Sequence, residues 1–113
     1  MAVAAAPVNV FQTITDTVGL STAVVYTAPI AYTGVVLLAQ ITNIGSTTET
    51  VSFNYRRGGI DTPMIRDLAI PANDTANLLA GKLVVETGDS LTLVGSDATN
   101  LKFLSSVLET SNL

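Results

Sequence analysis

The sequence predicts an all-β protein that folds as an antiparallel, jelly-roll-like β-sandwich of about eight short strands. Short segments alternate between apolar and polar residues, as half-buried strands do, and turn residues separate them at intervals of about ten residues. The chain of 113 residues is also long enough to bury one core without disulfides. We therefore expect a single β-sandwich domain over residues 8–113 and a flexible N-terminal arm over residues 1–7.

Four strands are expected in the first half of the chain. The period-2 alternation of Val8–Thr15 predicts the first strand. Ser21–Thr27 predicts the second, which ends where Pro29 forces the preceding residue into extended geometry. Val35–Thr42 and Glu49–Tyr55 follow, and their short separation indicates an antiparallel hairpin.

The second half supplies the remaining strands, namely Thr62–Ile70, Leu78–Leu79, Leu83–Glu86, Leu91–Val94 and Leu101–Thr110. In the first of these, Arg66 interrupts the face that Met64, Leu68 and Ile70 share. The last segment has a helical alternative, because four of its residues also recur at helical spacing. We favour a strand because the run is short and lacks a strong cap. A strand that is apolar on both faces is expected to lie centrally in a sheet or under a neighbouring subunit.

The charge content points to assembly. Only 12% of the residues are charged, against about 25% in ordinary soluble domains, and none is charged between Asp16 and Glu49. A small domain exposes much of its surface, so part of the apolar surface is expected to lie against other subunits. The alternative is a neutral, Thr-rich monomer. We expect a homo-oligomer, specifically a trimer.

Composition argues against nucleic-acid and membrane partners. The net charge of −4 and the five basic residues give little positive charge with which to neutralise phosphates. The best apolar run, Val35–Ala39, is far shorter than the roughly 20 residues of a spanning helix.

The residue inventory argues against an enzyme. The chain has no histidine and no cysteine, so it has no Ser-His-Asp triad, no cysteine nucleophile and no histidine metal ligand. Two carboxylate pairs remain as candidates for acid–base chemistry: Asp61 with Asp67, and Glu86 with Asp89. We interpret Asp89 as a turn residue instead, since it follows Gly88. No cofactor is expected.

Metal and anion sites are also not expected. Asn73-Asp74 and Asp97–Asn100 offer oxygen ligands, but neither has the spacing of an EF-hand loop. Arg56–Gly59 lacks the glycine and lysine context of a phosphate-binding loop. We interpret it as a hairpin tip whose arginines contact an acidic partner.

Five segments resemble, in order, small β-sandwich structural proteins of tailed bacteriophages: Val25–Pro29, Val36–Asn43, Ile70–Ala72, Leu79–Leu91 and Leu104–Glu109. In that group a Tyr-Thr-x-Pro strand end, an Ile/Val-Pro before a polar turn and a Gly-Lys-Leu-Val-Leu…Gly-Asp-x-Leu hairpin recur in this order. The resemblance covers about Val24–Glu109. The chain departs from it at Pro29–Tyr32, where the group often has a Pro-Ala-Gly turn, and at Arg56-Arg57.

The resemblance implies a non-enzymatic virion structural protein, in the first place a capsid decoration or cement protein that binds the major capsid protein. The alternatives are a neck, tail or fibre component, or a carbohydrate- or host-surface-binding module that would use tyrosines for stacking. We expect protein contacts through the N-terminal arm and the hairpin tip, at Ala2, Val3, Val8, Val10, Arg56, Arg57 and Ile60.

Overall fold

The computed structural model describes residues 8–112 of the chain and confirms the predicted all-β sandwich. The described residues form nine strands, as many as the segments expected from the sequence, and no helix. In chain order the strands are β1 (Asn9–Thr17), β2 (Ala23–Thr27), β3 (Tyr32–Asn43), β4 (Glu49–Arg57), β5 (Ile60–Ile70), β6 (Asp74–Asn77), β7 (Leu83–Val85), β8 (Ser90–Gly95) and β9 (Leu101–Ser111).

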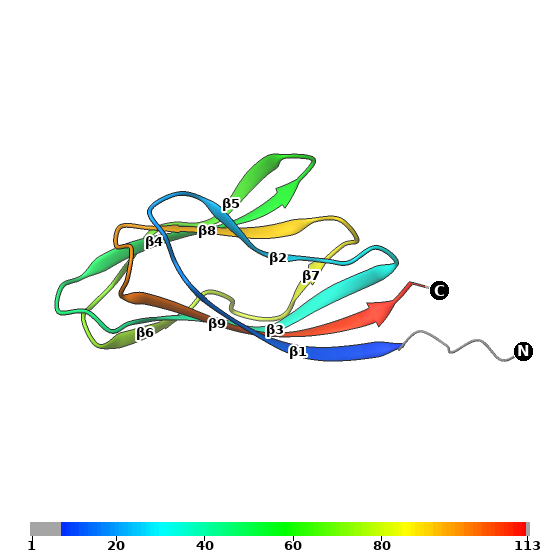
Figure 1. The fold of residues 1–113 in the computed structure, drawn as a ribbon, viewed down its shortest axis with the longest axis horizontal. Helices are drawn as coiled ribbons and strands as arrows, with labels where there is room; N and C mark the ends of the chain where they lie inside the picture. Colours follow the sequence, from blue (N-terminus) through cyan, green and yellow to red (C-terminus); the bar gives the residue numbers. More distant parts are fainter. Residues whose placement is uncertain (1–7, 113) are drawn as a thin grey trace, which may run out of the picture.

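The strands form two antiparallel sheets that lie one above the other (Figure 1). One sheet has the order β1-β9-β3-β6, with β7 also paired to β3, and the other has the order β2-β8-β4-β5. β6 and β7 pair with opposite ends of β3, so together they act as one interrupted strand. With that strand counted once, eight strands share two sheets in the jelly-roll arrangement.

The predicted hairpin between the third and fourth strands is wrong, because β3 and β4 belong to different sheets. The chain crosses between the sheets at residues 44–48, and the buried side chain of Asn43 fixes this crossing. Its Nδ2 donates to the carbonyl oxygens of Thr47 and Ile70, at 2.8 and 2.9 Å. Its Oδ1 accepts the N–H of Gly45 at 2.9 Å. Sequence proximity favoured a hairpin, but these bonds direct the chain to the opposite sheet.

The strand predicted at Leu78–Leu79 is also misplaced. The strand is β6, which ends at Asn77, directly before these residues. The turn comes earlier because Asn73 adopts a positive φ of 60° and donates its N–H to the Asn43 carbonyl. Leu78 follows the strand as a buried core residue whose N–H reaches the Ala39 carbonyl at 2.8 Å. β6 was not predicted because Ala76 is its one apolar residue, so the strand shows no alternation of apolar and polar residues.

The last strand behaves as predicted. Burial alternates along β9, with Leu101, Phe103 and Val107 facing the core. Leu104 and Leu108 lie on the opposite face and are partly exposed. β9 pairs with β1 on one side and β3 on the other. A strand apolar on both faces is therefore central in its sheet, and the helical alternative is excluded.

Two bulges in β5 explain how the strand accommodates a central arginine. The register with β4 shifts on both sides of Phe53, and Asp67 adopts a positive φ of 51°. Each extra residue turns the following side chains toward the other face. As a result Met64 and Ile65 pack against the core, while Arg66 is exposed.

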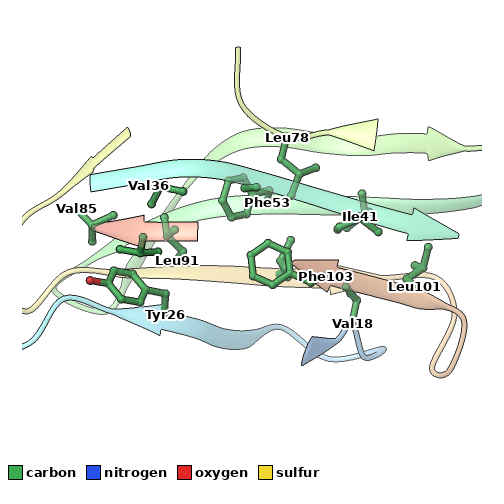
Figure 2. Packing of buried hydrophobic residues seen from close by; sticks show 14 of the residues in the cluster. Val18, Tyr26, Val36, Ile41, Phe53, Leu78, Val85, Leu91, Leu101 and Phe103 are labelled. Carbon is green, nitrogen blue, oxygen red and sulfur yellow. The ribbon is translucent and has the colours of Figure 1, made fainter. Parts of the chain in front are cut away.

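The core lies between the two sheets. Figure 2 shows Phe53 and Leu91 from one sheet facing Ile41 and Phe103 from the other. Phe53 and Ile41 have no exposed surface, and Leu91 and Phe103 expose 2% or less. Close packing of this kind makes the inner faces intolerant of changes in volume.

A polar network joins the sheets at the end of the sandwich where β1 begins and β9 ends. The Tyr26 hydroxyl donates to Glu109 Oε2 at 2.8 Å, and Gln12 Nε2 donates to the same oxygen at 2.7 Å. Burial, together with the hydrogen bond to Glu109, raises the pKa of Tyr26 well above its usual range. The tyrosine therefore remains a protonated donor to a carboxylate that is only 6% exposed.

Gly34 is required by this network. A Cβ at this position would lie 2.4 Å from the Tyr26 hydroxyl oxygen, which cannot withdraw without breaking its bond to Glu109. We expect Gly34→Ala to lower the free energy of unfolding by about 1–3 kcal/mol, as overpacking does. Chemical denaturation would measure the change. Gly19→Ala is the matched control, because a Cβ there meets nothing within 4 Å. Equal stability of the two variants would contradict the steric role of Gly34.

Candidate assembly surface

The predicted contact residues near the N-terminus separate into two groups. Ala2 and Val3 lie outside the described residues. Val8 precedes β1 and is 67% exposed, and its carbonyl accepts the Ser111 N–H. Val10 lies directly opposite the buried Glu109 and is itself partly buried, so its side chain is directed into the sandwich. Of the two described residues, Val8 is the one whose side chain the structure presents to solvent.

The predicted hairpin tip is present between β4 and β5. Gly58 and Gly59 have positive φ angles of 59° and 76°, as the central residues of a type I′ turn require. The next residue, Ile60, is paired with Arg57 and is 72% exposed. The tip projects from the body of the sandwich (Figure 1). It therefore carries an exposed isoleucine on a rigid turn.

Both arginines of the tip already bind acids of their own chain. Arg56 makes two bonds to the Asp61 carboxylate, at 2.7 and 3.1 Å. Arg57 Nη2 lies 2.7 Å from both Glu86 Oε2 and Asp89 Oδ2. The second arginine thus ties the hairpin to the residues between β7 and β8. The sequence predicted contacts with an acidic partner, whereas the structure pairs both guanidinium groups internally.

These pairings lower the pKa values of two of the candidate carboxylates. The Arg57 guanidinium, followed by the Tyr55 hydroxyl, holds the pKa of Asp89 below its usual range. The hydrogen bonds from Arg56 likewise lower the pKa of Asp61. A general acid at neutral pH needs a raised pKa, so both shifts have the wrong sign. Glu86 and Asp89 share one arginine and act as ion-pair partners.

Asp97, one of the loop acids considered as a metal ligand, instead accepts hydrogen bonds from the backbone. Asp97 Oδ1 accepts the N–H groups of Thr99 and Asn100, and these bonds lower the pKa of Asp97. Within residues 8–112, no group of three His, Cys, Asp or Glu side chains is placed to hold a metal ion. The same residues contain no helix long and apolar enough to cross a membrane.

A row of apolar side chains lies across the outer face of the β1-β9-β3-β7 sheet. In register, Phe11 lies opposite Leu108, Leu108 opposite Val35, and Val35 opposite Val84. We call these four residues the outer apolar row. Phe11 is 73% exposed and Val84 54%, and the two central members are partly exposed. Leu38, the next residue along that face of β3, is 37% exposed.

Only part of this row could be predicted from the sequence. It indicated that Leu104 and Leu108 form a second apolar face of the last strand. It did not indicate that Phe11, Val35 and Val84 would align with Leu108, because that alignment depends on the strand order. Residues 11 and 84 are more than seventy positions apart, and only β9 and β3 connect them.

Comparison with known proteins identifies the fold. No family model matches the chain, and no curated protein matches it. A solved structure of Bacillus endospore appendages, described as a novel family of disulfide-linked pili, is similar with a TM-score of 0.57 and 13% identity, covering 98% of each chain. The acidic stable capsid structure of Helicobacter pylori bacteriophage KHP30 is similar with a TM-score of 0.56 and 12% identity, covering 95% of this chain and 90% of that one. The chain thus shares its fold with chains from a pilus and a phage capsid.

The lowered carboxylate pKa values predict a loss of stability in acid. Asp61, Asp89 and Asp97 bind protons less readily in the folded state than in the unfolded chain. Their contribution is therefore complete above the unfolded pKa of about 3.9 and is lost as the pH falls through the lower folded values. Urea denaturation between about pH 6 and pH 2 would show this decrease. We expect the stability of Asp89→Asn to fall less steeply with decreasing pH than that of the wild type.

Lys82→Gln is the control, because it also removes one charge close to Asp89 in the sequence, but from an exposed residue. It should keep the wild-type pH dependence. A wild-type pH dependence in Asp89→Asn would contradict the role assigned to the Arg57–Asp89 pair.

Proposed function

We propose that this chain is a non-enzymatic structural protein of a bacteriophage virion, and specifically a capsid decoration or cement protein. It acts by protein–protein contacts in a repeated assembly. The observation that carries the proposal is the outer apolar row, a band of exposed hydrophobic side chains that the chain's own described residues leave uncovered.

The outer face of this sheet differs from an ordinary solvated face. An antiparallel sheet with one face in water usually carries polar residues on that face. Here the outward positions of β9 include Leu104 and Leu108, and the neighbouring positions of β3 include Val35 and Leu38. Contiguous exposed apolar surface of this kind marks interaction sites. The low charge of the chain agrees with burial of this face in an assembly.

The shared fold supports a role in assembly, and the residue inventory favours the capsid over the pilus. The similar pilus is described as disulfide-linked. This chain has no cysteine, so it cannot form such links. Capsid attachment through an apolar face needs no covalent link, because repeated copies bind with high avidity.

In this proposal the row faces the major capsid protein, and Ile60 on the projecting hairpin makes a second contact. The arm residues Ala2 and Val3, with Val8, reach a neighbouring subunit. Arg56 and Arg57 contribute by holding the hairpin rigid. Association into trimers is part of the same proposal.

The carbohydrate-binding alternative receives less support. Stacking on a sugar requires an exposed aromatic ring. Tyr26 is only 6% exposed, and its hydroxyl is committed to Glu109. Tyr55 is partly buried, and its hydroxyl donates to Asp89 at 2.6 Å. The exposed Phe11 lies within the outer apolar row, where a protein partner is the better match.

A charge placed in the row tests the proposal. We expect Val84→Lys to weaken binding to purified capsids that lack this chain by about tenfold or more, because an interface core disfavours an unpaired charge. Cosedimentation with the capsids would measure binding. Val24→Lys is the matched control: Val24 is also an exposed strand valine, 46% against 54%, but it lies in the other sheet. Equal binding by the two variants would contradict attachment through the row.

Antibody–gold labelling of purified phage particles tests the position of the protein. Decoration predicts label over the whole head surface. Label confined to the neck, tail or fibres would overturn the decoration role in favour of those alternatives.

A further inference from the structure

The outer edge of β1 lacks a partner strand within the described residues. β1 pairs with β9 along its whole length, from Asn9 to Thr17, without a bulge. In an antiparallel ladder the N–H and C=O groups of alternate residues point to opposite sides of the strand. The Val8 carbonyl and the Val18 N–H both bond to the chain at β9, so the even-numbered residues face β9.

The odd-numbered residues therefore direct their backbone groups away from the sheet. Phe11, Thr13 and Thr15 each present an N–H and a C=O to solvent, as does Asn9, and all four are exposed. The edge thus offers four alternate residues, from Asn9 to Thr15, whose backbone groups can bond to another strand. The stretch ends at Thr17, whose N–H is already bonded to the Asp16 side chain at 2.8 Å.

The other long edge in the sandwich is protected, which makes the openness of β1 informative. β5 carries Pro63, two bulges and the exposed Arg66, all features that block pairing with another strand. β1 has no proline, no bulge and a single charge, Asp16, at its end. An exposed, regular and nearly uncharged edge strand is a template for strand addition.

We propose that β1 binds β1 of a second copy of this chain, edge to edge and antiparallel, so that two outer sheets become one continuous sheet. The contact has two-fold symmetry. This inference rests on the proposed function in one respect, namely that several copies of the chain come together in the assembly. The proposed association into trimers would use a different surface.

The backbone selects the register of this pairing. When Phe11 lies opposite Thr13 of the second copy, Asn9 lies opposite Thr15, and all four positions of each edge find partners. Asp16 then falls outside the bonded stretch, so the two like charges are not apposed. The edge is complementary to itself without a gap or an unpaired donor in this stretch.

The side chains match the same register. On the inner side, Val10 lies opposite Ile14 of the second copy, which extends apolar contact across the junction. On the outer side, the Phe11 rings of the two copies are diagonal neighbours, a separation that aromatic side chains can bridge. The outer apolar rows of the two copies then form one continuous band. A second copy is thus the occupant that satisfies both the backbone edge and the exposed phenylalanine.

Hydrogen exchange followed by NMR tests the contact within one strand. We expect the amides of Phe11, Thr13 and Thr15 to exchange rapidly in dilute protein and at least tenfold more slowly in concentrated protein. The amides of Gln12 and Ile14, which face β9, serve as internal controls and should be protected at both concentrations. Rapid exchange of the three odd-numbered amides at every concentration would overturn the proposal.

Sedimentation of variants provides the second test. Proline at an edge position removes only an outward N–H, so Thr13→Pro retains the pairing with β9. It deletes two hydrogen bonds per dimer and should raise the dissociation constant by about tenfold or more. Thr13→Val keeps both the N–H and the β-branched shape, and it should dimerise within about threefold of wild type. Circular dichroism checks that both variants are folded.

The outcomes separate this inference from the proposed function. A folded Thr13→Pro that self-associates like wild type overturns the β1 contact. If that variant also still decorates capsids, the proposed function stands. Loss of capsid binding in Val84→Lys with normal self-association is the pattern expected when both are correct.

Discussion

The pairing of β9 with β1 and β3 is the interaction on which the rest of the structure depends. It joins the first and last strands of the domain and makes β9 the centre of its sheet. The inner face of β9 supplies Phe103 and Val107 to the core, and Glu109 to the network that joins the two sheets. The outer face of the same strand supplies Leu108 to the exposed apolar row. One strand therefore sets both the stability of the sandwich and the character of its surface.

Within the described residues, the polar side chains of the interior all have hydrogen-bond partners, whereas part of the surface has backbone groups and apolar side chains without partners. Every buried side-chain polar atom in residues 8–112 has a hydrogen-bond partner. Asn43 bonds across the crossing between sheets, Glu109 receives two donors, and Asp89 receives Tyr55 and Arg57. The groups without partners are at the surface. They are the exposed side chains of the outer apolar row and the outward backbone N–H and C=O groups of β1. A chain that is so fully satisfied inside, and apolar outside on one sheet, is better explained as part of an assembly than as an isolated domain.

The sequence predicted the fold class because alternation and turn residues are local signals. Burial of Phe53 and the strand character of β9 followed from them directly. The placement of β4 did not, because the bonds of Asn43 that direct the chain to the second sheet are tertiary. The outer apolar row was missed for a related reason, since its members come from four strands whose order no local pattern encodes. Arg57 was recognised as a residue of the hairpin tip, but its ion pairs with Glu86 and Asp89 were not predicted, because they too depend on the strand order.

The central claim is that the outer face of the β1-β9-β3-β7 sheet is covered in the working assembly. Cryo-electron microscopy of the assembled particle that contains this chain tests it most directly. The account predicts protein density against Phe11, Val35 and Val84 in every copy, with β1 continued by a strand of a second copy. A reconstruction in which this face and this edge border only solvent would contradict it.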